Sequence, residues 1–330
     1  MIQRRHLLAL AAGTTTAATL AARPARAADA VLPGGPVRIL VGFPPGGGTD
    51  VLARILAQKL GPLWGLPIVV ENKAGVAGVL AADYVAKQPG DGNTLLLAHI
   101  NSHGIASGLF PNIGYAADKD FTAIGLVGQT PIMLVCAPTQ PARTLDALVD
   151  LCRRNPGRVT FGSAGTGSAQ HLALEEFKAR AKIDVLHVPY KGSAPLMNDL
   201  LGGHVQYCFE GMTTATPLIR QGRVTAIAQT RAKRSRSHPQ VPTVAELGYP
   251  GFDTSIWFAL VGPARLPAAM VRRMNADLQA VLALPEVVEK FEQYGAEDGG
   301  GSPEKLDAFM RAERAKWAKI ISDAKITPDS

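Results

Sequence analysis

Charged side chains, cysteines and long apolar runs are all scarce in this chain. Of its 330 residues 18% are charged and 47% are hydrophobic, a balance typical of a compact globule and not of a disordered chain. The three cysteines leave at least one thiol unpaired, and their spacing matches no metal-binding pattern. Beyond the N-terminal region no apolar run is long enough to cross a bilayer. The composition predicts a soluble mature chain whose cysteines pack as small apolar residues.

The N-terminus carries the pattern of a bacterial export signal. Arg4-Arg5 opens it, Leu7–Leu20 is apolar and rich in small residues, and Ala25-Arg26-Ala27 is a cleavage site. We expect residues 1–27 to be removed after Ala27, leaving a periplasmic chain that begins near Ala28. The arginine pair suggests the twin-arginine route, with general secretion as the alternative.

Loss of this signal lowers the net charge. The whole chain has a formal net charge of +7, and removing the four arginines of residues 1–27 leaves 30 basic and 27 acidic residues. The densest basic stretch, Arg231–Arg236, has no interleaved aromatic side chains, so we expect a solvated loop and no nucleic-acid partner. Roughly 300 mature residues suit two α/β domains.

Two prolines and three glycines interrupt the first strand–helix unit. Val37–Gly42 reads as a buried strand and the residues from Val51 have a helical period; Phe43–Asp50 lies between them. Its backbone can approach a ligand closely, and Thr49 or Asp50 can cap a helix whose free N–H groups favour an anion. The loop has no lysine, which excludes a nucleotide P-loop. We predict a backbone-built anion cradle at the carboxyl edge of a parallel sheet.

A second glycine-rich loop, Gly162–Ser168, precedes a predicted helix at Ala169–Ala181. Its glycine order misses the dinucleotide fingerprint, and it contains no G-x-S-x-G nucleophile elbow, so we expect no cofactor and no catalytic residues. A turn with a capping serine is the simpler alternative. Two such loops on different lobes could hold the two ends of a small dianion.

The order of predicted elements indicates two α/β lobes. Apolar runs at Phe121–Ala137 and Trp257–Val261 read as crossings between them, and polar loops are expected at Ile100–Gly104, Pro189–Ser193 and Glu210–Thr214. Lobe 1 is then discontinuous, with residues 28–127 and 253–330, and lobe 2 has residues 128–252. A ligand would lie in the cleft between the lobes.

Several segments of the chain resemble receptors of tripartite tricarboxylate transporters, the Bug family. The matching segments are VGFPPGGGTDVLARILAQKL, VVENKAGVAGVLAADYVAKQPGDGNTLLL, FGSAGTGSAQHLALEEFK, HVPYKGSAPLMNDLLGGHVQ and VPTVAELGYPG. The resemblance implies a type II periplasmic binding protein fold, two-lobed with its ligand cleft between the lobes. It also implies a monomer that captures a small carboxylate for the permease subunits of a membrane transporter, without catalysis, cofactor or metal.

The resemblance also implies which residues bind the ligand. In lobe 1 these are Phe43, Pro44, Pro45, Gly46, Gly47, Gly48 and Asp50, with Asn101 and Ser102 on a polar loop. In lobe 2 they are Ser163, Ala164, Gly167, Ser168 and His171, together with Tyr190 and Glu210. Glu210 stands where many members have Asp and is expected to meet an ammonium or hydroxyl group of the ligand.

Other hypotheses remain open from the sequence. The protein could instead be a sensor that passes its liganded form to a membrane kinase, or an exported α/β hydrolase. His99 and His103 are expected to pack at a strand end or contact the ligand, and not to bind zinc. His171 and Glu175 are read as a contact on a helix surface. The ligand's identity is left open among organic and amino acids.

Overall fold

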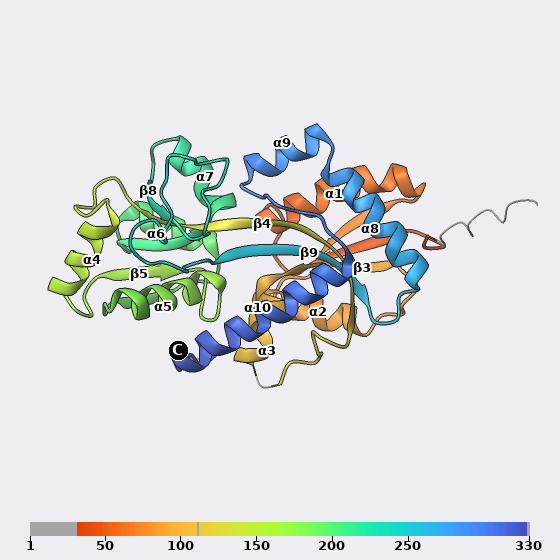
Figure 1. Ribbon diagram of the computed structural model, residues 1–330, viewed down its shortest axis with the longest axis horizontal. Coiled ribbons are helices and arrows are strands. Elements are labelled where there is room, and N and C mark those ends of the chain that lie inside the picture. Colours follow the sequence, from red (N-terminus) through yellow and green to blue (C-terminus); the bar gives the residue numbers. More distant parts are fainter. Residues whose placement is uncertain (1–31, 111, 329–330) are drawn as a thin grey trace, which may run out of the picture.

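Two groups of α/β elements, joined by two long strands, make up the part of the chain that the computed structural model describes, residues 32–110 and 112–328 (Figure 1). We call the groups lobe 1 and lobe 2. The expected signal peptide, residues 1–27, lies outside the described residues. The two-lobed α/β architecture predicted from the sequence is confirmed.

Lobe 1 contains the N-terminal elements and the last three helices. Its elements are β1 (Val37–Val41), α1 (Gly48–Trp64), β2 (Ile68–Asn72), η1 (Val76–Gly78), α2 (Val79–Ala86), β3 (Thr94–His99), η2 (Asn101–Ile105), α3 (Ala106–Leu109), α8 (Ala268–Leu282), α9 (Pro285–Gln293) and α10 (Pro303–Asp323). Lobe 2 contains α4 (Leu145–Arg154), β5 (Thr160–Ser163), α5 (Ala169–Ala181), β6 (Leu186–Pro189), α6 (Ser193–Gly202), β7 (Tyr207–Gly211), α7 (Met212–Arg220) and β8 (Thr225–Gln229).

The strands β4 (Phe121–Cys136) and β9 (Ser255–Pro263) run through the middle of the molecule (Figure 1). The sheet order is β2-β1-β3-β9-β4-β7-β5-β6, with β8 also paired to β4. The first part of β4 pairs with β9, whereas its last five residues pair with β7 and β8. One strand therefore belongs to the sheets of both lobes, which confirms the first predicted crossing.

Within each lobe the strands that precede the candidate loops are parallel. β1 pairs in parallel with β2 and β3, and β5 pairs in parallel with β6 and β7. Their carboxyl ends therefore share one edge in each lobe, where open α/β sheets bind ligands. Every residue of β3, reading TLLLAH, is buried, which is why its side chains from Leu95 to Ala98 are all apolar.

Two loops predicted from the sequence are regular structure instead. Residues 101–105 form the π-helical turn η2, which continues into α3 and is buried throughout. Glu210 and Gly211 end β7, and α7 begins directly at Met212. Tertiary packing stabilises these short polar segments, whose composition alone favours loops.

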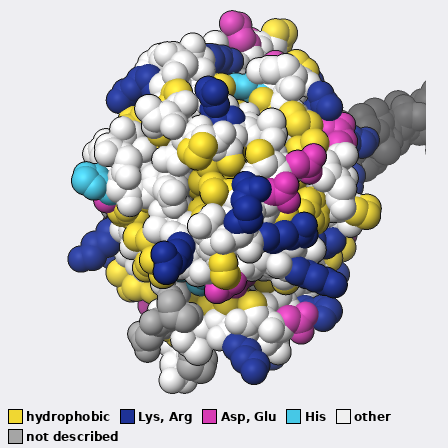
Figure 2. Space-filling model, turned by 90° about the vertical axis from the view of Figure 1, so that its left-hand side faces the viewer, with side chains coloured by type: hydrophobic (Ala, Val, Ile, Leu, Met, Phe, Trp, Pro, Cys, Tyr) yellow, Lys and Arg dark blue, Asp and Glu magenta, His cyan; other side chains and the backbone are white. Residues whose placement is uncertain are grey.

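The basic stretch Arg231–Arg236 is an irregular and mostly exposed segment, as expected, and its three arginines form ion pairs. Arg231 pairs with Asp298 at 2.7 Å, Arg234 with Glu246 at 2.8 Å and Arg236 with Glu292 at 2.8 Å. Figure 2 shows the lobe 2 end of the molecule, where Lys and Arg side chains are interspersed with acidic and uncharged ones. The sequence alone did not indicate these ion pairs, because the acidic partners of Arg231 and Arg236 lie far along the sequence.

Three further expectations can be compared with the described residues. No helix in residues 32–110 or 112–328 is long and apolar enough to cross a membrane. The three cysteine thiols are buried and unpaired, as expected of small packed residues. The lobe boundaries at residues 127 and 253 stay a prediction.

Candidate functional site

The predicted ligand-binding residues gather where the carboxyl ends of the parallel strands face each other across the two lobes. β1 and β3 bring the segments 43–48 and 101–102 to this seam from lobe 1. β5, β6 and β7 bring the segments 163–168, 190–193 and 210–214 from lobe 2. The roles of these residues in binding stay predictions.

Asp50 braces the glycine-rich loop of lobe 1. Its carboxylate accepts hydrogen bonds from Gly46 N, from Arg54 Nε and from Asn72 Nδ2, each at 2.9 Å. Burial alone would raise its pKa, but the bonds from Arg54, Gly46 and Asn72 hold the pKa below its ordinary value. Asp50 is therefore ionised and already fully partnered. Asp50 shapes the loop. The helix α1 begins after Gly47, and neither Thr49 nor Asp50 caps it with its side chain as the sequence suggested.

Gly46 is the loop residue that needs glycine for its backbone. Its φ is 84°, in the left-handed region, whereas Gly47 has a φ of −77°. At the start of the loop, the ring centroid of Phe43 lies 4.6 Å from that of His99. The Asp50 hydrogen bond to Gly46 and the ring contact of Phe43 thus hold the loop at both of its ends.

The π-helical turn of lobe 1 directs its polar groups inward. Ser102 Oγ donates to His99 O at 3.1 Å and lies 3.0 Å from His103 Nδ1. Burial lowers the pKa values of His99 and His103 to about 3, so both rings are neutral near pH 7. The side chains of Ser102 and the two histidines support the turn, whereas the Asn101 amide reaches across to lobe 2.

The second glycine-rich loop is held by side chains that follow it. Ser168 caps α5, its Oγ accepting from His171 N at 3.2 Å. Ser163 has no exposed surface; its Oγ accepts from Gly165 N at 3.2 Å and lies 2.7 Å from His187 Nε2. In this loop, the serine–histidine pair is the arrangement that most resembles a nucleophile with its base. Because the hydroxyl is buried and used by its own loop, the pair acts as a support.

His171 is buried and does not lie on the helix surface as expected. Its ring stacks on that of His187 with 3.9 Å between centroids and 4° between planes. Its Nδ1 accepts from Gly167 N at 3.1 Å, and its Nε2 lies 3.7 Å from Glu175. Burial, with neighbouring positive charge, lowers the pKa to about 3 for His171 and to about 4 for His187. Two neutral rings can stack here, whereas two imidazolium rings would repel each other.

Tyr190 and Glu210 differ in how their polar groups are used. The phenol of Tyr190 donates to Asp199 on α6 at 2.9 Å. Glu210 is 1% exposed; its Oε1 accepts from Ser193 Oγ at 2.8 Å and from Gly211 N at 2.7 Å. Burial raises the pKa of Glu210 to about 7 despite these hydrogen bonds. Its Oε2 is buried and has no hydrogen-bond partner among the described residues.

The two lobes touch directly at the seam. Asn101 Oδ1 accepts from Ala169 N, at the start of α5, at 3.3 Å. A Cβ on Gly48 would lie 2.8 Å from Thr213 Oγ1, and a Cβ on Gly167 would lie 2.0 Å from Leu109 Cδ2. The loops of the two lobes therefore meet in a closed arrangement.

Sequence reasoning missed the partners that complete this arrangement. Asn72 ties Asp50 to Phe43 O, and Thr213 meets Gly48. Asn72 could have been found from its place after the carboxyl end of a predicted strand. Thr213 could not, because its role depends on how the lobes face each other.

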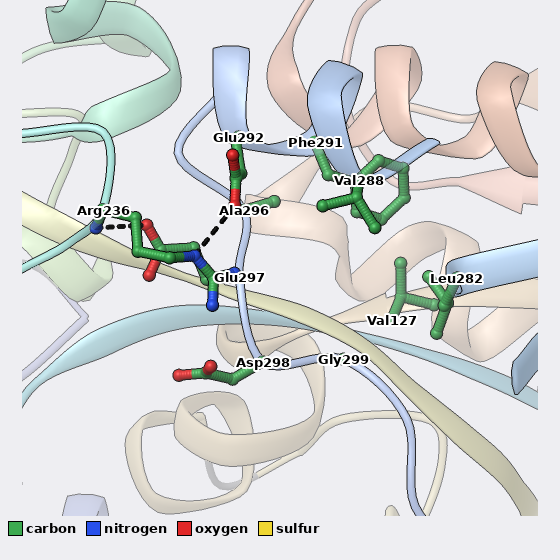
Figure 3. A pocket seen from close by; sticks show the side chains of 10 residues that line it. All are labelled: Val127, Arg236, Leu282, Val288, Phe291, Glu292, Ala296, Glu297, Asp298 and Gly299. Carbon is green, nitrogen blue, oxygen red and sulfur yellow. Dashed lines mark hydrogen bonds and ion pairs between the residues drawn. The ribbon is translucent and has the colours of Figure 1, made fainter. Parts of the chain in front are cut away.

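A cavity of about 230 Å³ lies away from this seam, beside β4 (Figure 3). Apolar side chains of Val127, Leu282, Val288 and Phe291 line one part of it. Arg236 from lobe 2 closes the other part through its ion pair with Glu292. This cavity contains none of the predicted site residues.

Comparison with known families decides the identity. The profile described as "Tripartite tricarboxylate transporter family receptor" matches residues 52–326. The chain belongs to this receptor family. Protein BugT of Bordetella pertussis is similar, with 38% identity over 292 residues that cover 88% of this chain and 90% of that protein.

Solved structures of receptors in this family share the fold. A structure from R. palustris, Rpa4515 with adipate, has 34% identity and a TM-score of 0.84, covering 89% of this chain and 99% of that one. MatC from Rhodopseudomonas palustris with bound malate has 30% identity and a TM-score of 0.80, covering 88% and 100%. The family is one of periplasmic solute-binding receptors.

Proposed function

We propose that this receptor captures a small carboxylate between its lobes and presents it to the permease subunits of a tripartite tricarboxylate transporter. The observation that carries the proposal is that each glycine-rich loop region touches the opposite lobe, Gly48 at Thr213 and Gly167 at Leu109. The N-terminal turns of α1 and α5 lie at this seam, and the backbone N–H groups of a helix start suit carboxylate groups at the two ends of one ligand. The adipate and malate in the two R. palustris structures are ligands of this kind.

Capture requires the lobes to open and close. Because Asn101 already contacts Ala169 and Gly48 already abuts Thr213, a ligand enters only when these contacts separate. The strand β4, shared by both sheets, is the natural position for a hinge. A ligand that contacts both lobes then shifts the population towards the closed form.

The remaining parts of the proposal concern location and partners. Residues 1–27 direct export and are removed after Ala27, and the mature receptor acts as a periplasmic monomer. The ligand-binding residues are those named from the sequence. Asp50, Ser163 and His171 act by holding the loops, and backbone groups with Asn101 and Glu210 contact the ligand.

A panel of acids tests the proposed function. Adipate, malate, succinate, citrate and benzoate, with glycerol as an uncharged control, are screened by thermal shift and then by calorimetry. At least one carboxylate is expected to raise the melting temperature and to be recovered unchanged by mass spectrometry. Consumption of the acid, or no response to any carboxylate in the panel, would contradict the proposal.

Two adjacent glycines provide a matched test of closure. Gly48→Ala places a methyl group against Thr213 and is expected to weaken carboxylate binding about tenfold, because overpacking costs about 1–3 kcal/mol. Gly47→Ala meets only Pro44 O at 3.7 Å and should change affinity less than about twofold. Equal effects of the two substitutions would show that the lobes do not close on Gly48.

A further inference from the structure

Glu210 presents an unused carboxyl oxygen at the seam. It is the residue before the last of β7, where its Cα pairs with that of Met133 on the shared strand β4. Three residues later, Thr213 meets Gly48 of the other lobe. The side chain is 1% exposed and Oε2 accepts no hydrogen bond of ordinary length among the described residues, so this oxygen is desolvated with only the weaker support of the Gln170 and Thr214 side chains. Such a group costs free energy unless a ligand completes it.

The surroundings of Glu210 are rich in hydrogen-bond donors. Ser193 begins α6 and Gly211 precedes α7, and both donate to Oε1. Gln170 in the first turn of α5 and Thr214 in α7 also favour the ionised form. The N-terminal turns of three helices thus converge on one carboxyl group, at a point that suits an anion.

The charged and titratable groups on the elements around Glu210 are few near the carboxyl group itself. On β7 the buried thiol of Cys208 is electrostatically coupled to it. The others lie on β4, β7, α5, α6 with its preceding loop, and α7: Cys136, Tyr207, His171, Glu175, Glu176, Lys178, Arg180, Tyr190, Lys191, Asp199 and Arg220. His171 is neutral, Asp199 accepts from Tyr190, and Lys191 is exposed.

A dicarboxylate entering this seam brings a second negative charge to the same donors. Two adjacent carboxylates repel each other, and one proton shared between them removes the repulsion and adds a hydrogen bond. The raised pKa of Glu210, about 7, makes that proton available at neutral pH.

We infer that Glu210 shares a proton with one carboxylate of a bound dicarboxylate, so that capture takes up a proton at this carboxyl group. The inference rests on the proposed function. The proton comes from solvent, bridges Glu210 Oε2 and a ligand oxygen in the closed form, and returns to solvent on release. No covalent bond forms or breaks in the ligand.

Calorimetry in buffers of different ionisation enthalpy tests this inference. The probe is the tightest-binding of adipate, malate and succinate. The expected uptake is about half a proton per ligand at pH 7 and close to one above pH 8, with affinity falling up to about tenfold per pH unit there. The matching monomethyl ester, if bound through its single carboxylate at the lobe 1 loop, should take up no proton.

Glu210→Gln is the diagnostic variant. Its amide can donate the same hydrogen bond without a proton from solvent, so binding at pH 6 should stay within about threefold of the unmodified protein and become independent of pH. Glu176→Gln changes another buried glutamate of lobe 2, which is bonded to Arg180 and Thr254, and should leave proton uptake unchanged. Uptake that persists in Glu210→Gln would overturn the inference.

Other outcomes separate this inference from the proposed function. Carboxylate binding without proton uptake overturns the inference but leaves the proposed receptor function standing. The same holds if glutamate binds more tightly than any unsubstituted dicarboxylate and no proton is taken up. If only monocarboxylates bind, the inference is likewise overturned and the proposed receptor function stands. As a ligand-free check, ¹³C NMR of the glutamate carboxyls should show a signal that titrates near pH 7 and is lost in Glu210→Gln. An ordinary midpoint near pH 4.5 also overturns the inference.

Discussion

At the scale of single residues, several side chains predicted to bind ligand hold the glycine-rich loops in place. Asp50 bonds Gly46, Ser163 bonds Gly165, and His171 accepts from Gly167. Each side chain fixes a glycine N–H that flexible loop sequence alone would leave mobile. This is how a backbone-built site becomes rigid enough to discriminate between ligands.

Substitutions of Ser168 test whether its hydroxyl caps α5 or contacts the ligand. Ser168→Ala removes the cap of α5 and is expected to lower the free energy of unfolding by about 1 kcal/mol. Ser168→Asp keeps a capping oxygen and should recover most of that stability, while its charge repels an anionic ligand. Denaturant unfolding measures both. If Ser168→Ala weakens binding but leaves stability unchanged, the hydroxyl contacts the ligand and does not cap the helix.

At the scale of elements, the sequence predicted most strands and helices because their periodicity follows directly from burial. β3 is continuously apolar, and α10 places Leu306, Met310, Trp317 and Ile321 on its buried side. The π-helical turn η2 was missed because its buried polar residues, such as His103, read as a loop. Likewise Thr213, whose contact partner Gly48 lies in another lobe, carries no local signal.

The turn η2 positions one amide that joins the lobes. Asn101→Ala removes the acceptor for Ala169 N and is expected to weaken carboxylate binding about threefold to tenfold, since a hydrogen bond contributes about 1 kcal/mol. Ser107→Ala on the exposed side of α3 is the matched control and should have no effect. Calorimetry provides the affinities. A stability loss in Asn101→Ala with unchanged affinity would assign Asn101 to the turn alone.

At the scale of the whole molecule, the basic stretch of lobe 2 forms a polar strap to the end of α9 and to the segment between α9 and α10 of lobe 1. Beside the ion pairs of Arg231 and Arg236, Ser235 Oγ donates to Glu297 at 2.6 Å and Arg236 N donates to the same carboxylate at 2.8 Å. Glu297 in turn exchanges backbone hydrogen bonds with Gln129 on β4. The strap thus borders the shared strand and stabilises one relative placement of the lobes.

Neutralising the strap should shift the lobes towards the open form. The double substitution Arg231→Gln with Arg236→Gln is expected to enlarge the radius of gyration of the ligand-free protein in X-ray scattering. Carboxylate affinity should fall about twofold to fivefold, because exposed ion pairs contribute less than about 1 kcal/mol each. Arg234→Gln removes a pair that lies entirely within lobe 2, so it should change neither quantity.

Added salt should produce the same shift in the unmodified protein and little further change in the double variant, since screening acts on the same charges. A double variant with the dimensions and affinity of the unmodified protein would show that β4 and β9 alone set the angle between the lobes.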